Sequence, residues 1–191
     1  VIDGRWIHFG DLSQPVSEVA ASADSGDALL RRADFTKAAT ERGMVGPGGG
    51  ILRNTGVHSF DLLRFLTGRE AEEAFCCDQK AVTRRTEDGF AAVLKLEGGG
   101  LAVVENCRST GSRSGRIELV GEHGQLCGDH VHGTLLEIHG NRVRPLPVPA
   151  PAPTVRECLA AFTTAVLEGL PVPIPLAEGI RAMEIVDACR R

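Results

Sequence analysis

The sequence predicts an α+β fold in which helices pack on one face of an open, mostly antiparallel (mixed) β-sheet. Three observations predict it: a segment of helical periodicity at 57–68, a series of short apolar segments separated by glycine turns between 72 and 146, and two amphipathic segments near the end. With 191 residues, of which 42% are hydrophobic, the chain has enough material for one core. We therefore expect residues 1–191 to form a single domain.

The first 47 residues give the least regular pattern. A short strand is expected from Trp6 to Phe9, and the composition of Ala28 to Glu41 favours a helix. Gly43, Gly46 and Pro47 interrupt that helix, so the rest of this region is expected to be loop.

Three consecutive glycines, Gly48–Gly50, precede the first clear helix. Glycine lets the backbone turn freely or approach another group closely. The helix is expected to end at Gly68, which suits a C-cap. Its apolar positions are expected to face the core, namely Val57, Leu62, Leu63, Phe65 and Leu66.

Short strands follow the helix. The segments Ala74–Cys76 and Ala81–Thr83 are β-prone, and Phe90–Leu96 and Leu101–Asn106 form a hairpin through a glycine-rich loop. Because their apolar residues would face both sides of the sheet, we expect the second face to be covered by another domain or by a second copy of the chain, which predicts a homo-oligomer formed through the sheet. Further strands are expected at 116–120, 124–127, 134–139 and 142–146.

The end of the chain contains an extended arm and two helices. Residues 145–153 alternate proline with small apolar residues, which favours an extended connection. Amphipathic helices are expected at 155–167 and 176–190.

Composition excludes several classes of protein. A net charge of −4 without a basic stripe argues against nucleic acid or an anionic membrane surface as partners. No segment has the length of a membrane span or the pattern of a secretory signal, which predicts a soluble, cytoplasmic protein. The six cysteines have no ligand-like spacing, and we expect reduced, mostly buried thiols.

Polar residues recur on one face of the helix at 57–68. Asn54 precedes His58 by four residues, and Asp61 follows His58 by three, so a helix would place an amide, an imidazole and a carboxylate on one side. An imidazole can accept a hydroxyl proton, and an amide can bind a hydroxyl-rich ligand. His58 is therefore the candidate catalytic residue, with Asn54, His58 and Asp61 as candidate substrate-binding residues. The alternative for His58 is a helix histidine with a local hydrogen bond, and for Asp61 a surface carboxylate.

A second group of histidines raises the question of a metal. His130 and His132 would share one side of a strand, with His123 nearby. Because loop histidines beside glycines are common and no cysteine pair supports them, we predict that the chain has no metal site.

The segment from Gly48 to Gly68 resembles the C-terminal substrate and oligomerisation domain of the Gfo/Idh/MocA family of NAD(P)-dependent oxidoreductases. That family has a pattern like G-G-G-x-x-x-D-x-G-x-H-x-x-D followed by apolar residues and a glycine. Gly56, His58 and Asp61 match it, whereas Asn54 stands where the family more often has Asp. The resemblance implies that His58 is a catalytic or substrate-contacting residue.

The resemblance also implies what the full-length protein contains. An N-terminal Rossmann domain, absent from this chain, would bind NAD or NADP, and no G-x-G-x-x-G turn occurs here. The substrate would be a sugar, an inositol or a related polyol that exchanges hydride with the nicotinamide, and this chain alone would be inactive. The alternative is a catalytically silent ligand-binding or dimerisation module, which the amide of Asn54 favours because an amide transfers no proton.

Overall fold

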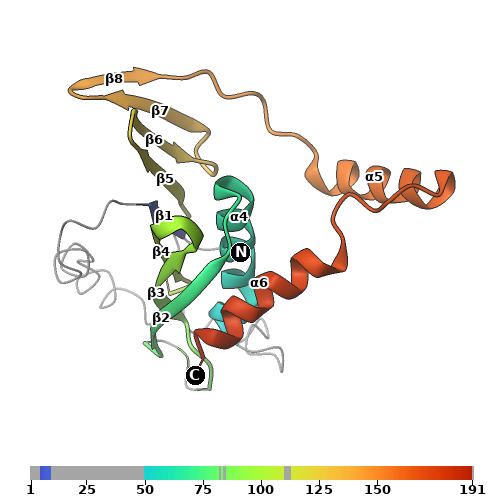
Figure 1. Ribbon diagram of the computed structural model, residues 1–191, viewed down its shortest axis with the longest axis horizontal. Coiled ribbons are helices and arrows are strands. Elements are labelled where there is room, and N and C mark those ends of the chain that lie inside the picture. Colours follow the sequence, from blue (N-terminus) through green and yellow to red (C-terminus); the bar gives the residue numbers. More distant parts are fainter. Residues whose placement is uncertain (1–4, 10–49, 82, 84, 110–112, 191) are drawn as a thin grey trace.

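In the computed structural model, residues 5–9, 50–81, 83, 85–109 and 113–190 are described, and they form one eight-stranded sheet with helices (Figure 1). The order of strands across the sheet is β2-β3-β4-β1-β5-β6-β7-β8. The strands are β1 (Arg5–Phe9), β2 (Ala71–Gln79), β3 (Gly89–Leu96), β4 (Gly100–Cys107), β5 (Gly115–Gly121), β6 (Gly124–Asp129), β7 (Thr134–His139) and β8 (Arg142–Pro145). The helices are a π-helical turn η1 (Leu52–Gly56), α4 (Val57–Thr67), α5 (Thr154–Glu168) and α6 (Leu176–Ala188), with a short 3₁₀ turn η2 (Glu97–Gly99) between β3 and β4.

The sheet is mixed but mostly antiparallel. β1 pairs antiparallel with β4 and parallel with β5, whereas every other neighbouring pair among the described strands is antiparallel. This arrangement confirms the expected α+β fold, including the strand near Trp6 and the hairpin of β3 and β4. The helix expected from Ala28 to Glu41 lies outside the described residues.

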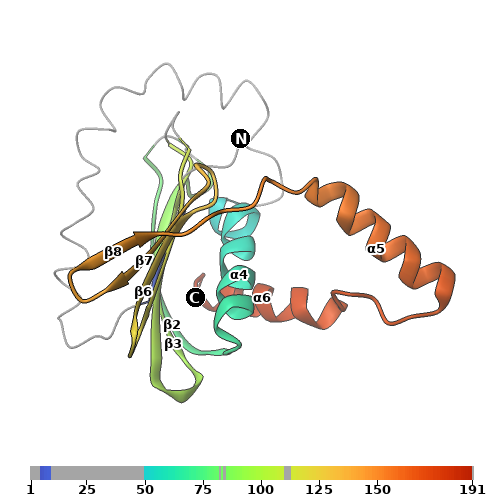
Figure 2. The same ribbon diagram turned by 90° about the horizontal axis from the view of Figure 1, so that it is seen from above.

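Helices α4 and α6 pack on the same face of the sheet (Figure 2). Side chains of β3 alternate, so that every second residue from Phe90 to Leu96 points to these helices. Phe60 of α4 contacts Phe90, with 5.9 Å between the ring centroids. The core therefore lies between two helices and the β2–β4 half of the sheet, and its other buried members are Ile51, Leu52, Leu63, Ala92, Leu94, Leu96, Ala102, Val104, Ile185 and Val186.

Two expectations for α4 and its neighbours are wrong. Phe65 is 82% exposed and Leu66 is also exposed, because the helical period that buries Phe60 and Leu63 turns positions 65 and 66 away from the sheet. The expected strand at Ala81–Thr83 is wrong too, because neither Ala81 nor Thr83, its described residues, lies in a strand.

Asp88 explains why the segment after β2 is not a strand. Its buried carboxylate accepts hydrogen bonds from the backbone N–H groups of Ala81 (2.9 Å) and Thr83 (2.7 Å). These donors are therefore not available to a neighbouring strand, and the chain turns back toward β3.

The cysteines are less buried than expected. All six are free thiols; Cys77 and Cys158 are exposed and the other four are only half-buried. Cys76 and Cys77 both lie on β2, so their side chains point to opposite faces of the sheet.

The arm that begins at Pro145 has no helix or strand from 146 to 153 and leads to α5, which projects away from the sheet (Figure 2). No helix in the described part of the chain is long and apolar enough to cross a membrane.

Candidate functional site: the exposed face of α4

The candidate site begins with an irregular turn of helix. Residues Leu52–Gly56 form a π-helical turn that continues directly into α4. Glu87 fixes the start of this turn: its backbone carbonyl accepts the N–H of Ile51 (3.0 Å) and its carboxylate accepts the N–H of Leu52 (3.3 Å). The first turn of a helix leaves N–H groups without partners and carries partial positive charge, so a carboxylate there is stabilising. π-helical turns are rare and often occur at functional sites.

Two glycines of the motif lie against other side chains. A Cβ on Gly50 would meet the carboxyl group of Glu87, and a Cβ on Gly56 would lie 2.9 Å from Cζ of Phe90. Gly50 therefore lets Glu87 reach the helix start, and Gly56 lets the helix approach the sheet. This agrees with the expectation that glycines here permit close approach.

Ser59 and Asn106 fix the rotation of α4 about its axis. Ser59 Oγ donates to Asn106 Oδ1 at 3.2 Å, and Asn106 Nδ2 donates toward Ser59 Oγ at 3.1 Å; both side chains are fully buried. Because Ser59 must face β4 to make this contact, the neighbouring residue His58 is turned toward the surface.

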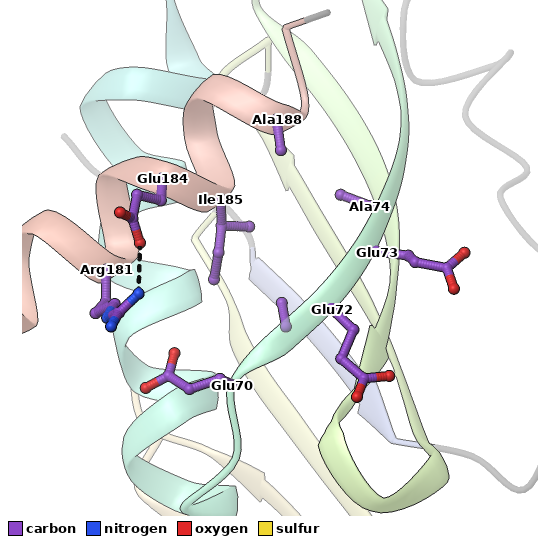
Figure 3. A pocket seen from close by; sticks show the side chains of 9 residues that line it. Glu70, Glu72, Glu73, Ala74, Arg181, Glu184, Ile185 and Ala188 are labelled. Atoms are coloured by element: carbon purple, nitrogen blue, oxygen red, sulfur yellow. Dashed lines mark hydrogen bonds and ion pairs between the residues drawn. The ribbon is translucent and has the colours of Figure 1, made fainter.

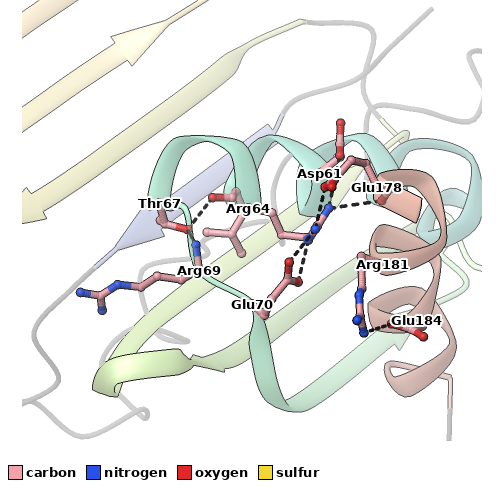
Figure 4. Close-up of polar contacts among 9 residues, drawn as sticks. Asp61, Arg64, Thr67, Arg69, Glu70, Glu178, Arg181 and Glu184 are labelled. Atoms are coloured by element: carbon pink, nitrogen blue, oxygen red, sulfur yellow. Dashed lines mark hydrogen bonds and ion pairs between the residues drawn. The ribbon is translucent and has the colours of Figure 1, made fainter. Parts of the chain in front are cut away.

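Arg64 ties α4 to β2 and α6 (Figure 4). Its guanidinium donates two bonds to the carboxylate of Glu70, at 2.6 and 2.8 Å, and one to the carboxylate of Glu178 at 2.8 Å. The hydrogen bonds with Glu70 raise the pKa of Arg64, against an opposing effect of burial, and the same bonds lower the pKa of Glu70. The guanidinium is thus held charged, and it fixes the end of α4 that follows the candidate residues.

The candidate residues Asn54, His58 and Asp61 are all exposed. His58, Asp61 and Phe65 follow one another at helical spacing, so they lie on the side of α4 that faces away from the sheet. Phe65 was expected in the core but is an exposed aromatic side chain two helical turns from His58. Its seven-residue spacing from His58 was the signal that could have placed it on the polar face.

Contacts within this face are few. The hydroxyl of Thr55 donates to Asn54 Oδ1 at 3.4 Å, and the carboxylate of Asp61 lies 3.7 Å from Arg64. Among the described residues, Asp61 is therefore directed toward Arg64, and no hydrogen bond joins it to His58. The face offers an amide, an imidazole and a carboxylate whose donor and acceptor atoms can bind a hydroxyl-rich ligand.

A cavity of about 130 Å³ lies elsewhere, between the start of β2 and α6 (Figure 3). Glu70, Glu72, Arg181 and Glu184 line it, and Arg181 pairs with Glu184 at 3.1 Å. None of the three candidate residues reaches this cavity, so it is separate from the proposed site.

The histidines considered as metal ligands have other contacts. His130 and His132 lie in the turn between β6 and β7 and not on a strand, so the expected alternation is wrong. His130 Nδ1 contacts the carbonyl of Gly115 at 2.9 Å, and His132 Nδ1 contacts the carboxylate of Asp129 at 2.8 Å. Among the described residues, no group of three His, Cys, Asp or Glu side chains is arranged to hold a metal ion.

Asp129 organises this turn. Its Oδ1 accepts the backbone N–H groups of Gly115, Val131 and His132 at 2.9–3.1 Å. Burial would raise the pKa of Asp129, but the bonds from His132 and these backbone groups outweigh it and lower the pKa to about 2. The turn histidines therefore act in a structural network.

The fold and the glycine-histidine segment define the class of protein. Residues 13–127 match the family model for the GFO/IDH/MocA C-terminal domain, and the chain belongs to this family. The resemblance inferred from the motif is thereby confirmed.

The chain also matches individual curated proteins. The chain is 32% identical over 155 residues to myo-inositol 2-dehydrogenase of Thermotoga maritima. The matched segment covers 75% of this chain and 46% of the relative. It spans about half the length of the curated relatives that it matches.

Solved structures share the fold at low identity. UDP-N-acetylglucosamine 3-dehydrogenase of Acidithiobacillus ferrooxidans matches 99% of this chain and 52% of its own, with a TM-score of 0.67 and 17% identity. Biliverdin reductase of Synechocystis, solved with biliverdin and NADP⁺, matches 100% of this chain and 54% of its own, with a TM-score of 0.62 and 15% identity.

Proposed function

We propose that this chain is the substrate-binding half of an NAD(P)-dependent dehydrogenase that transfers hydride between the nicotinamide and an inositol, a sugar or a related polyol. One observation supports the proposal most: the only imidazole on α4, that of His58, is exposed on a helical segment that contacts of Glu87, Ser59 and Arg64 hold at three points along its length. A catalytic site needs an accessible functional group on a rigid element. Dehydrogenase relatives, one of them named for myo-inositol, support the substrate class.

The chain's own residues would have distinct roles in this reaction. His58 would accept the hydroxyl proton of the alcohol as hydride leaves its carbon, and would return it when the ketone is reduced. Asn54 would bind a neighbouring hydroxyl through its amide. Asp61 would bind a further hydroxyl. NAD or NADP would supply the hydride acceptor from a Rossmann domain in the full-length protein.

Asn54 makes the alternative function concrete. If the family's usual Asp is needed at this position for turnover, the protein would bind its polyol without oxidising it, as a catalytically silent ligand-binding or dimerisation module.

The test uses the full-length natural protein with a panel of inositols and sugars and with both nicotinamides. The proposal expects substrate-dependent formation of NADH or NADPH. Binding of a polyol by calorimetry without turnover, combined with turnover in the variant Asn54→Asp, would establish the silent module instead. The absence of both binding and turnover across the panel would contradict the dehydrogenase and the ligand-binding module, and would leave only the dimerisation module.

The open face of the sheet is the proposed surface for a second copy. Phe75 of β2 is 68% exposed and pairs in register with Val93 of β3, which pairs with Val103 of β4. These three apolar side chains form a row across the face opposite α4 and α6, and burying such a row drives association.

Light scattering tests this assembly. We expect the full-length protein to be an oligomer and the variant Val103→Glu to be a smaller species, whereas the control Thr164→Glu on α5 keeps the size of the wild type. A wild-type monomer at micromolar concentration would contradict the assembly.

A further inference from the structure

Two cysteines from distant parts of the sequence meet at one edge of the core. Cys76 lies on β2, the edge strand of the sheet, and Cys189 caps the end of α6, 113 positions further along the chain. Both side chains are half-buried, and both pack against the core between the helices and the sheet. The fold therefore brings together two thiols that no local sequence pattern relates.

The backbone explains why both thiols face the space between β2 and α6. Cys76 pairs in register with Ala92 of β3, which is fully buried under the helices. Because side chains alternate along a strand, Cys76 points to the helices and Cys77 points to the open face. The N–H of Cys189 donates to the carbonyl of Ile185 at 3.0 Å, so Cys189 continues the last turn of α6, which carries the buried Ile185.

The neighbours of the two cysteines show how closely these elements approach. Ala74 of β2 and Ala188 of α6 face each other across the cavity described above (Figure 3). Ala74 lies two residues before Cys76 on the same side of the strand, and Ala188 directly precedes Cys189. The cysteines are thus the next residues along the two walls of this cavity.

The two thiols also interact directly through a hydrogen bond. The S–H of Cys76 donates to the sulfur of Cys189, and this bond lowers the pKa of Cys189 against the opposing effect of burial. The same bond raises the pKa of Cys76, and burial adds to that rise. The thiolate is the nucleophile in thiol–disulfide exchange, so Cys189 is the sulfur that attacks first.

We propose that Cys76 and Cys189 form a reversible disulfide when the protein meets a low-molecular-weight disulfide such as glutathione disulfide. The Cys189 thiolate attacks one sulfur of the oxidant and releases a first thiolate, which leaves a mixed disulfide on Cys189. Cys76, once deprotonated, attacks the Cys189 sulfur and releases the second. The two cysteines together lose two protons and two electrons, and the oxidant becomes two thiols.

The bond would fix both ends of α6. The first turn of α6 is already held, because the carboxylate of Glu178 accepts a hydrogen bond from Arg64 of α4 at 2.8 Å. The disulfide would attach the other end, at Cys189, to β2. A cross-link over so long a loop restricts the unfolded chain, which stabilises the folded domain. The bond does not depend on the proposed reaction, since neither cysteine belongs to the face that carries His58.

Peptide mapping of the full-length protein tests the disulfide. The folded protein is treated with glutathione disulfide, the remaining thiols are alkylated, and trypsin separates residues 70–80 from residues 182–190. We expect these two peptides to be linked, with fragment ions that place the bond at Cys76 and not at Cys77. Dithiothreitol should remove the link, and the same treatment in urea should give it only as a minor product among other pairings.

Single variants separate the two roles. In Cys76→Ser we expect no link and a glutathione adduct that remains on Cys189, because no second thiol displaces it. In Cys189→Ser we expect no link. The matched control is Cys77→Ser, which removes the neighbouring thiol on the other face of β2 and should leave the link unchanged.

Three results would overturn the disulfide: no link between the two peptides in the folded wild type, a link that is lost in Cys77→Ser, or a link that forms as readily in urea as in the folded protein. If a variant does not fold, the fragment ions of the wild type and the comparison with urea still decide the question.

Discussion

Helices α4 and α5 both carry apolar residues at helical spacing, yet their surroundings differ. α4 has its apolar face in the core, and Glu87, Ser59 and Arg64 each fix it through a partner within this chain. α5 has only Ala165 buried and exposes an apolar stripe, formed by Val155, Leu159, Phe162 and Val166. The difference teaches that periodicity predicts that a helix has a face to bury, but not whether the partner lies in the same domain.

The largest expected effect on stability is at Arg64. Replacing Arg64 with Met leaves Glu70 and Glu178 close together without their shared cation, and we expect a loss of about 2–3 kcal/mol. That estimate lies below the cost for a fully buried pair because both carboxylates are nearly half exposed. Urea unfolding measures the loss.

Arg181 is the matched control, because it forms a single exposed pair with Glu184. The variant Arg181→Met should change the free energy of unfolding by no more than about 0.5 kcal/mol. Equal effects at Arg64 and Arg181 would show that the buried cluster does not hold α4.

The second effect is at the contact between Ser59 and Asn106. The variant Ser59→Ala leaves the buried amide of Asn106 without its partner, which should cost about 2 kcal/mol. The double variant Ser59→Ala with Asn106→Leu should recover part of that loss, because no polar group is then left unsatisfied. A cost in the double variant equal to the sum of the two single variants would mean that the two side chains do not act as a pair.

The third effect concerns Asp129. Like α4, its carboxylate is fixed by partners within this chain. Its pKa in the folded protein is about 2, below the usual value of an unfolded Asp, so its contribution to stability is present above about pH 4 and is lost as the pH falls toward 2. The variant Asp129→Asn should therefore lose stability at pH 6 but show a shallower decrease between pH 4 and pH 2. Urea midpoints across this range measure both quantities; parallel acid profiles for the two proteins would contradict the assignment.

The smallest effect is expected on α5. In the 191-residue chain, Leu159→Ser should change the free energy of unfolding by less than about 0.5 kcal/mol, because the side chain is already in water. In the full-length protein the same change should cost about 1–3 kcal/mol if the stripe is buried there. Equal small effects in both proteins would remove the contrast between α4 and α5.

The sequence predicted the architecture well where signals are local. The glycine-linked hairpin, the short strands and the end of α4 at Gly68 are marked by turn chemistry and period. The strand expected at Ala81–Thr83 failed because the buried carboxylate of Asp88 binds its backbone, and β-propensity carries no information about that contact.

The candidate site was likewise predicted only where its signals are local in the sequence. Asn54, His58 and Asp61 share a helix, so their spacing predicts a common face, and the structure leaves all three exposed. Glu87 and Asn106, which hold that helix, are 35 and 47 residues away from their partners, and no local pattern links them. Phe65 was assigned to the core because it is apolar, although its seven-residue spacing from His58 puts both residues on one side of the helix.

The most direct test of the account compares kcat of the full-length protein with that of His58→Ala, using the best substrate from the inositol and sugar panel. His139→Ala serves as the control, since His139 is an exposed histidine at the end of β7. We expect His58→Ala to lower kcat by about 10²-fold or more while nicotinamide binding is unchanged, and the control to have no effect. Unchanged kcat and KM in His58→Ala would contradict the claim that the exposed face of α4 is the site of reaction.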